Sequence, residues 1–393
     1  MTATAPPPTS ARPAAIELFR SNAGVRWATY AAVVVVLLTL TQEFARPSTD
    51  QLTSSGTASL AIRWAVPIML AGFGGLWAER AGIVNIGLEG MMVLGTWFGA
   101  YGAVIGSPWL GVLMGVAGGA LGGLLHAIAT VTFRVDHIVS GVAINLLAPG
   151  VTRFLSDEVF SGYSGGSISQ SPSVDDVGEF DVPLLSDVLE WFADRNWIIL
   201  SDTAGILGGL VQEVSWLTLL AYSVVPLTFF VLWRTTFGLR LRSCGEDPWA
   251  AETLGINVIF HKFVAVIVSG ALAGLAGAFI VIELTGIYKE NQTNGRGFIG
   301  LATMIFGNWR PVGTALGALL FGFADALQLR DRTAVHALLL LAAIALALLA
   351  LRALVKRNYW TTALLGIFAV LFAVWYAASD TVPSQLPQVT PHI

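Results

Sequence analysis

The chain has 393 residues, of which 55% are hydrophobic and only 12% are charged, and its mean hydropathy is +0.72. A soluble domain carries about 25% charged residues, so this composition excludes a soluble globular protein and indicates a polytopic membrane protein. A single cysteine, Cys244, excludes an intrachain disulfide and a cysteine-based metal cluster. No lysine follows a glycine, which excludes a Walker phosphate loop.

The N-terminal residues 1–26 are rich in proline, alanine and threonine and carry three arginines against one glutamate. This composition buries little apolar surface, so we expect a mobile N-terminus, and its positive charge places it in the cytoplasm. The apolar run 27–41 is shorter than the roughly 20 residues of a perpendicular span. A cleaved signal peptide is the alternative, but no Ala-x-Ala site follows, and we favour an uncleaved span.

Ten more apolar runs follow the first. They cover residues 58–77, 83–105, 109–133, 138–155, 216–233, 263–284, 298–306, 312–327, 334–351 and 361–378. Together the runs predict an all-α membrane helix bundle with about 10–11 transmembrane helices, in which the run 298–306 is short enough to be a half-helix. The helices group into a first half (27–155), a second half (215–330) and a C-terminal set (331–378), followed by a tail (379–393).

Charge along the chain predicts which side each connection faces. Alternating spans from a cytoplasmic N-terminus put Arg134, Arg310 and the polar segments 234–262 and 352–357 inside, as the positive-inside rule requires, whereas 330–332 fall outside. The segment 156–214 carries eleven acidic residues and one arginine, so we expect an extracytoplasmic acidic loop. Its G-x-S-x-G pattern around Ser164 follows no apolar strand and does not predict a catalytic serine.

One polar island, residues 234–262, contains signals for a short exposed helix. Asp247 suits an N-cap, Pro248 suits the first helical position and Gly255 suits a left-handed stop, which predicts a helix over residues 248–254. Two turns are marginal alone in water, so the helix needs neighbours, and it presents Trp249 and Leu254 to a partner. The alternative is a connecting loop with an incidental helix. Cys244, just before this helix, is expected to be accessible from the cytoplasm.

A weak internal repeat relates the two halves of the chain. The sequence LAGFGG of residues 70–75 resembles LAGLAG of residues 272–277, and the IGL of residues 86–88 with the residues after it resembles the IGL of residues 299–301. The copies run in opposite directions in the expected topology, and inverted repeats are typical of transporters with a substrate path between the copies. The alternative is a chance match between glycine-rich and alanine-rich spans.

Polar residues within the apolar runs are candidates for a substrate path. Glu89 lies between glycines near the start of its run, and we expect it to line the path or to fix a broken helix. The other candidates for the path are Asn85, Trp97, Phe98 and Asn145. For Asn145, Asp325 and Gln328 an interhelical hydrogen bond is favoured over lining the path. For His126 and His137 a packing role is favoured over a metal site. Glycines at every fourth position from Gly111 to Gly123 indicate either close packing within the bundle or a subunit contact.

Four ordered blocks of sequence carry a resemblance to a known family. They are ERAGIVNIGLEGMM at 79–92, SGVAIN at 140–145, GEDP to GIN at 245–257, and GRGFIGL with FGNW at 295–309. They resemble the permease subunits of bacterial ABC importers of the branched-chain amino acid, simple-sugar and nucleoside branch, and are most similar to the nucleoside permeases. The resemblance covers roughly residues 58–330, and the acidic loop, the N-terminus and the last span depart from it.

The resemblance implies a type II importer permease in the bacterial plasma membrane, with no catalytic residue and no metal of its own. It implies that the short helix is a coupling helix for a separate ATPase that binds ATP and Mg²⁺. That helix region comprises Glu246, Asp247, Pro248, Trp249, Ala250, Ala251, Leu254 and Gly255. The implied partners are the ATP-binding subunit, a second related permease and an extracytoplasmic solute-binding lipoprotein, with no nucleic acid. A ribose-type sugar permease, a secondary transporter and an intramembrane hydrolase are the alternatives.

Overall fold

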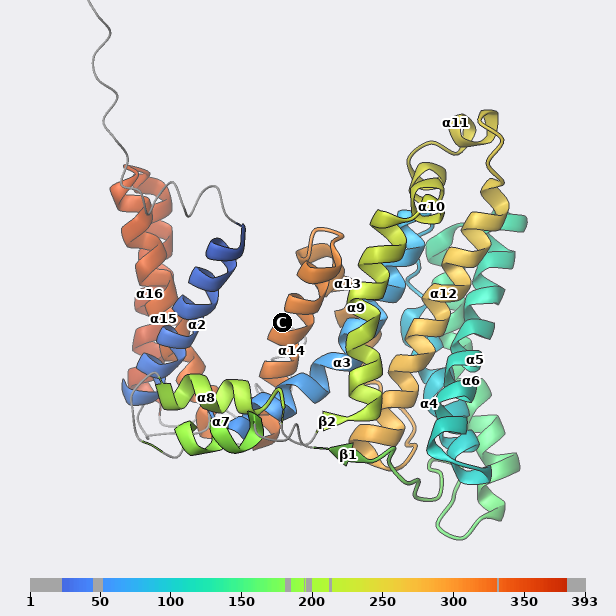
Figure 1. Ribbon diagram of the computed structural model, residues 1–393, viewed down its shortest axis with the longest axis horizontal. Helices are drawn as coiled ribbons and strands as arrows, with labels where there is room; N and C mark the ends of the chain where they lie inside the picture. Colours follow the sequence, from blue (N-terminus) through green and yellow to red (C-terminus); the bar gives the residue numbers. More distant parts are fainter. Residues whose placement is uncertain are drawn as a thin grey trace, which may run out of the picture.

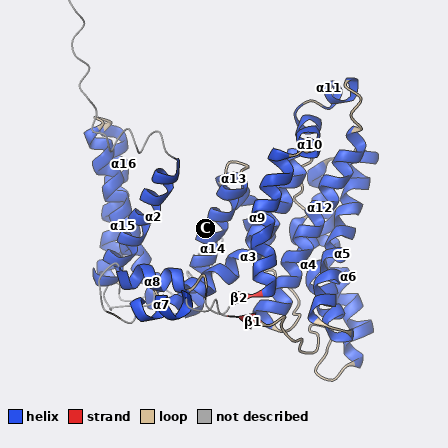
Figure 2. Cartoon of the chain, viewed as in Figure 1, coloured by secondary structure: helices blue, strands red, loops and turns tan. Residues whose placement is uncertain are grey.

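The computed structural model describes residues 23–44, 52–180, 185–193, 195, 200–211, 214–330 and 332–379. Helices form nearly all of their regular structure, which confirms the all-α prediction (Figures 1 and 2). The helices are α2 (Ala23–Phe44), α3 (Ser55–Arg80), α4 (Leu88–Ile105), α5 (Pro108–Ala127), α6 (His137–Val159), α7 (Leu185–Ala193), α8 (Leu200–Gly208), α9 (Trp216–Arg234), α10 (Thr236–Glu246), α11 (Pro248–Thr253), α12 (Val258–Phe279), α13 (Arg296–Phe306), α14 (Pro311–Arg330), α15 (Arg332–Val355) and α16 (Tyr359–Ala378).

Short elements complete the described chain. The π-helices Ile128–Thr132 and Ile280–Thr285 extend α5 and α12, and the 3-10 helix Phe160–Gly162 follows α6. The two-residue strands β1 (Glu179–Phe180) and β2 (Val214–Ser215) pair antiparallel. The expected mobile N-terminus lies outside the described residues except for its last four, which already belong to α2. The tail lies outside them except for Ser379.

The helices match the predicted apolar runs. Among the described residues, eight helices are long and apolar enough to cross a membrane, and three shorter apolar helices, Ala31–Gln42, Arg296–Phe306 and Pro311–Leu327, accompany them. Each of the eleven runs coincides with one of these eleven helices, and the run 298–306 is the short helix α13, as expected for a half-helix. The chain is a multi-pass membrane protein.

Glycine allows the central helices α4, α5 and α12 to pack with their backbones in contact. A Cβ on Gly115 would lie 2.9 Å from the carbonyl oxygen of Gly95, and a Cβ on Gly119 would lie 2.5 Å from the nitrogen of Gly274. Both distances are shorter than real Cβ contacts, so no larger residue fits. The stripe from Gly111 to Gly123 therefore serves packing within the chain, which is one of the two roles that the sequence predicted.

The order of contacts along the helices shows the directions in which the repeated segments run. These contacts are Arg63–Glu283 and Gly74–Ser269 between α3 and α12, Gly95–Gly274 and Gly99–Ala278 between α4 and α12, and Gly72–Gly300 and Gly75–Met304 between α3 and α13. α3 and α12 are therefore antiparallel, α4 runs with α12, and α13 runs with α3. Because α4 and α13 point in opposite directions, the structure has the predicted inverted-repeat character.

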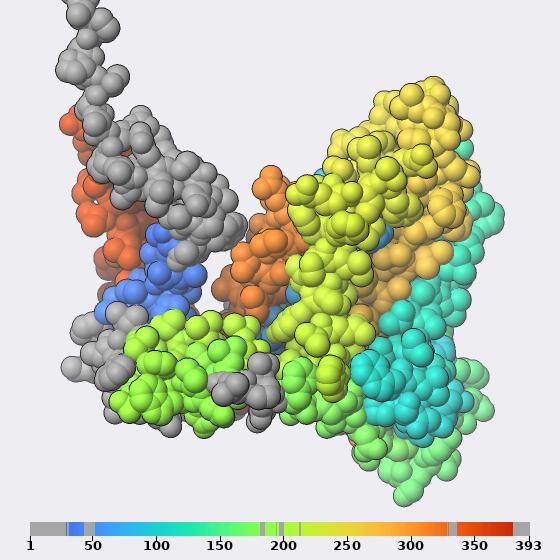
Figure 3. All heavy atoms as spheres, in the orientation of Figure 1, coloured from blue at the N-terminus to red at the C-terminus, as the bar shows by residue number. Residues whose placement is uncertain are grey.

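The bundle has two different ends, which we call the α11 end and the β1 end (Figure 1). The predicted acidic loop lies at the β1 end, but it is more ordered than a loop: α6 continues to Val159, and α7 and α8 form two further helices. In Figures 1 and 3 these two helices lie to the left of β1, beside the start of α3. Arg63 of α3 ties β1 to the bundle, since its guanidinium lies 2.9 Å from Glu179 and 3.4 Å from Glu283.

Candidate functional site

Two helices, α4 and α13, begin inside the bundle instead of at one of its ends. α3 is 26 residues long, about 39 Å at 1.5 Å per residue, and it provides a scale for depth. Leu88, the first residue of α4, packs against Gly74 and Gly75 of α3, and Gly300 of α13 packs against Gly72. Both first turns therefore lie well within the length of α3. We call the meeting of these two helix starts, residues 85–90 and 295–297, the junction.

Glu89 joins the two helices at the junction. Its carboxylate accepts a hydrogen bond of 2.8 Å from the backbone N–H of Gly295 and one of 2.6 Å from that of Gly297. The first N–H groups of a helix have no partner within the helix, and in the apolar part of a membrane each unpaired group costs several kcal/mol. Glu89 therefore caps the start of α13, 206 residues away in the sequence, whereas the sequence analysis considered only a role in the path or at the helix beside it.

Two asparagines hold the segment before α4. Asn145 of α6 accepts a hydrogen bond of 2.8 Å from the N–H of Gly90 and donates one of 3.0 Å to the carbonyl of Ile86. Asn85 is buried, accepts from the N–H of Gly87 at 3.0 Å and donates to the hydroxyl of Ser269 on α12 at 2.8 Å. The junction thus satisfies backbone groups that an irregular segment inside a membrane would leave unpaired.

An ion pair that sequence reasoning missed lies beside the junction. Arg296, the first residue of α13, lies 3.0 Å from the carboxylate of Asp325 on α14, and its guanidinium lies 4.4 Å from the ring centroid of Trp64. Both charged side chains are nearly buried. Asp325 was among the predicted candidates for an interhelical hydrogen bond, whereas Arg296 lies just outside the apolar run, which begins at residue 298. The signal that could have identified Arg296 is a cation directly before a short apolar run.

The predicted aromatic path residues lie apart from the junction. Trp97 is buried, donates a hydrogen bond of 3.0 Å to the hydroxyl of Ser156 and stacks on Tyr101 with ring centroids 5.3 Å apart. Phe98 packs edge-on against Trp97 at 5.1 Å. The structure therefore brings Asn85, Glu89 and Asn145 together and places the two aromatic residues in a packed cluster toward the β1 end.

The two candidate histidines lie near the α11 end. The ring of His126 contacts the hydroxyl of Ser140 at 2.9 Å and the carbonyl of Val84 at 3.2 Å, which agrees with a packing role. Nδ1 of His137 lies 3.4 Å from the backbone nitrogen of Val84. Among the described residues, no three His, Cys, Asp or Glu side chains gather as a metal site.

The short helix of the polar island forms as the sequence predicts. The carboxylate of Asp247 accepts a hydrogen bond of 3.0 Å from the N–H of Ala250, and Gly255 has a φ of +78°. α11 ends at Thr253, so the predicted helix is one residue too long, and Leu254 is its C-cap. Trp249 and Leu254 are both 80% exposed, while Ala251 is buried beneath them. α11 thus presents a large apolar surface outside the bundle.

The island contains a second helix, α10, that the sequence analysis missed. Its N-cap is Thr235, whose hydroxyl accepts a hydrogen bond of 3.1 Å from the N–H of Gly238. Cys244 lies on the inner face of α10 and is fully buried, so the expectation of an accessible thiol is wrong. Burial also raises the pKa of this thiol.

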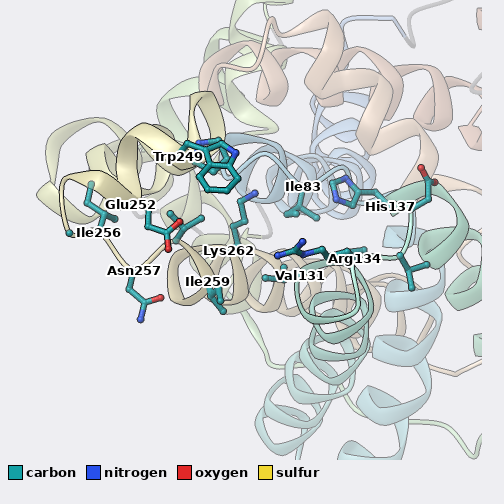
Figure 4. Close-up of a pocket in the computed structure, with 16 residues that line it drawn as sticks. Ile83, Val131, Arg134, His137, Trp249, Glu252, Ile256, Asn257, Ile259 and Lys262 are labelled. Carbon is teal, nitrogen blue, oxygen red and sulfur yellow. The ribbon is translucent and has the colours of Figure 1, made fainter.

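A hollow of about 990 Å³ separates α11 from the ends of α5, α6 and α12 (Figure 4). Trp249 and Glu252 line it from α11, Arg134 from the connection before α6, His137 from the start of α6, and Lys262 from α12. The hollow leaves one flank of α11 free of contact with the bundle. A partner could therefore reach α11 from its tip and from this flank.

Comparison with known proteins identifies the family. Residues 57–330 match the family described as branched-chain amino acid transport system / permease component. The chain belongs to this permease family. A nucleoside ABC transporter permease protein of Lactococcus lactis is 40% identical, and the match covers 67% of this chain and 79% of that protein. A guanosine ABC transporter permease protein of Bacillus subtilis is 36% identical, and the match covers 68% of this chain and 79% of that protein. A putative glucose ABC transporter permease protein of Haloferax volcanii is 34% identical over 71% and 79%.

The family match has a clear structural extent in this permease. It begins in α3 and ends with α14, so it includes the junction, α10, α11 and the segment at the β1 end. It leaves out α2, α15 and α16, of which α15 and α16 pack on each other to one side of the bundle (Figure 1). The predicted limits of the resemblance, residues 58–330, are confirmed.

Proposed function

We propose that this permease is the membrane-spanning subunit of an ATP-driven importer and that its cargo is a nucleoside. The observation that carries the proposal is the similarity to two permeases named for nucleosides and guanosine, at 40% and 36% identity. The junction agrees with a cargo that needs no positively charged side chain to bind it. Its arginine, Arg296, is already paired with Asp325, so it offers no free positive charge to the carboxylate of an amino acid.

The energy for import would come from a separate ATP-binding subunit, because the chain lacks a phosphate loop. That subunit would hold ATP and Mg²⁺ and would dock on α11, where Trp249 and Leu254 stand free of the bundle. The docking region comprises Glu246, Asp247, Pro248, Trp249, Ala250, Ala251, Leu254 and Gly255. ATP binding and hydrolysis would then bias the permease between two conformations.

The orientation follows from charge. The α11 end holds Arg134, Arg240 and Arg310, which suits the cytoplasm, and the acidic segment at the β1 end suits the outside of a bacterial plasma membrane. A solute-binding lipoprotein would deliver cargo at the β1 end. A second, related permease would pack against α6, most of whose apolar side chains are exposed, among them Leu146 and Phe154.

The path for the nucleoside would pass the junction. Two helix starts meet there, and the segments before them are irregular, a combination that membrane transporters use at their substrate sites. Asn85, Glu89 and Asn145 would shape this part of the path through the backbone they hold. Trp97 and Phe98 would support its wall toward the β1 end without stacking directly on the base, because Trp97 is fully packed.

Uptake by whole cells tests the proposal. Cells that lack this chain and cells that carry it on a plasmid are compared for uptake of labelled adenosine, uridine, ribose and leucine. We expect nucleoside uptake to require the chain and leucine uptake to be the same in both. Loss of ribose uptake alone would contradict the nucleoside assignment.

A sugar is the second candidate cargo because the putative glucose permease is also 34% identical. A sugar shares the ribose hydroxyls of a nucleoside but lacks the base. The same experiment with labelled glucose separates the two, since a sugar importer would restore glucose or ribose uptake and leave adenosine uptake unchanged.

A further inference from the structure

The half-helix α13 is held at both of its ends by one short stretch of chain, residues 79–89. At its start, Glu89 accepts the hydrogen bonds from Gly295 and Gly297. Just after its end, Arg80 donates a hydrogen bond of 2.6 Å to the carbonyl of Trp309, and the indole N–H of Trp309 donates to the carboxylate of Glu79. α13 therefore cannot shift along its axis without moving this stretch or breaking these bonds.

The turn after α13 is strained, which indicates that the contacts to Glu79 and Arg80 fix it. Asn308 and Trp309 have φ values of +51° and +50°. Asparagine adopts this left-handed conformation readily, but a bulky residue such as Trp309 adopts it rarely. A bulky residue in this conformation costs about 1–3 kcal/mol and persists only where its surroundings hold it. The bonds from Trp309 to Glu79 and Arg80 supply that restraint.

The same stretch of chain contacts the island that carries α11. A Cβ on Gly245, near the end of α10, would collide with the carbonyl of Arg80 and would lie 2.9 Å from the nitrogen of Gly82. The guanidinium groups of Arg80 and Arg242 both lie near the ring of Trp233, at 5.2 Å and 5.8 Å from its centroid. Because α10 ends at Glu246, directly before Asp247, the cap of α11, residues 80–82 lie close to the start of α11.

We propose that residues 79–89 form a clamp that makes α13 follow the movement of α10 and α11, and that Arg80 is the positioning residue of this clamp. A displacement of α11 would reach residues 80–82 through Gly245 and Trp233. From there it would act on Trp309 at one end of α13 and, through Glu89, on the other end at the junction. The element that moves would be α13, a helix of 11 residues with contacts of its own at each end.

This inference rests on the proposed function, because it presumes that a partner ATPase moves α11. The test uses the complete complex in lipid, with spin labels on cysteines introduced at Phe306 of α13 and Leu113 of α5 in a Cys244→Ala chain. Both positions are exposed, and α5 belongs to the glycine-packed core that serves as the fixed reference. The inter-label distance is measured with and without ATP, together with ATP hydrolysis and uptake.

Two variants weaken the clamp to different degrees. Arg80→Ala removes the guanidinium. Trp309→Phe removes the indole N–H together with the five-membered ring, but it keeps an aromatic side chain and the backbone carbonyl that accepts from Arg80, so it tests the clamp even where the first variant fails to fold. We expect both to assemble and hydrolyse ATP but to lose the ATP-dependent change in distance. Uptake should fall roughly tenfold, since hydrogen bonds to charged groups are among the strong ones. Arg240→Ala, an exposed arginine of the same island, is the control and should behave as the unaltered chain.

The outcomes separate the clamp from the importer assignment. The clamp would be overturned, and the importer assignment left standing, if the ATP-dependent change in inter-label distance survived in both variants. The same holds if the unaltered complex showed no such change. Failure of the unaltered chain to associate with an ATP-binding subunit would overturn the importer assignment.

Discussion

Glu89 and Gly297 are joined by a hydrogen bond of 2.6 Å from the backbone N–H of Gly297 to the Glu89 carboxylate, and this bond links the starts of two helices that begin inside the bundle. A Cβ on Gly297 would lie 2.6 Å from the Cα of Glu89, so the two backbones are in direct contact. The carboxylate acts as an N-cap supplied by another helix. In α13 the capping residue is thus distant in sequence, while in α11 it is the adjacent Asp247.

Removing this carboxylate should destabilise the permease. Glu89→Ala leaves the N–H groups of Gly295 and Gly297 without acceptors, at about 1–3 kcal/mol each. Glu89→Gln keeps one acceptor oxygen and should lie between. Thermal unfolding of the purified protein in lipid nanodiscs measures the effect as a drop in Tm. Glu158→Ala, an exposed acid on α6, is the control, and an unchanged Tm for Glu89→Ala would contradict the capping role.

Alanine should be harmful at the packed glycines. In an unobstructed helix, Gly→Ala stabilises by about 1 kcal/mol, so a loss of stability reports crowding. Gly119→Ala and Gly274→Ala place a methyl group against the facing backbone, and such overpacking costs about 1–3 kcal/mol. Gly366→Ala in α16, where nothing lies within 4 Å, should be neutral or stabilising. The Tm values of the three variants in nanodiscs test whether the glycines are crowded. Equal values for all three would show that α5 and α12 are not in contact.

Cys244 should resist thiol reagents in the folded protein. It is fully buried, and its raised pKa means that less thiolate is present at pH 8 than for a free cysteine. A maleimide should therefore label it in neither intact cells nor inverted vesicles, but should label it after denaturation. Trp249→Cys in a Cys244→Ala chain should be labelled only in inverted vesicles. Labelling of Trp249→Cys in intact cells by an impermeant maleimide would reverse the proposed orientation.

The left-handed stop after α11 should be needed for coupling. Gly255→Val forces a β-branched residue to a φ of +78°, which is strongly disfavoured, whereas Gly255→Asn should be tolerated because asparagine adopts this conformation more readily. We expect the valine variant to insert and to hydrolyse ATP in the complex with little transport. Uptake and hydrolysis measured on the same preparations test this, and normal uptake in Gly255→Val would rule out a coupling role for this turn.

The sequence predicted the parts of the fold that depend on local pattern. Apolar runs marked the eleven helices, and Asp247, Pro248 and Gly255 marked α11, because spans and caps are determined by neighbouring residues. The sequence did not predict α10, because three of its eleven residues are charged and few of its positions are apolar. Its cap, Thr235, was a signal that could have predicted it.

The sequence identified some residues of the candidate site but not their partners, and the reason is physical. Placing a carboxylate inside a membrane span costs free energy, and this identified Glu89 as important. Its partners, Gly295 and Gly297, lie 206 and 208 residues away in the sequence. The pair of Arg296 and Asp325 and the clamp between Arg80 and Trp309 are likewise contacts between distant segments. One sequence without the fold cannot show which helices meet, so such partners emerge only from packing.

This permease would provide the path for ATP-driven nucleoside import. The most direct measurement is accumulation of labelled adenosine in proteoliposomes that contain the complete complex, its solute-binding protein and ATP, compared with the same complex carrying Glu89→Ala. We predict accumulation that depends on ATP, is abolished or strongly reduced by Glu89→Ala and is competed by unlabelled uridine but not by leucine. Accumulation of leucine or of a free sugar without accumulation of adenosine would contradict a nucleoside path.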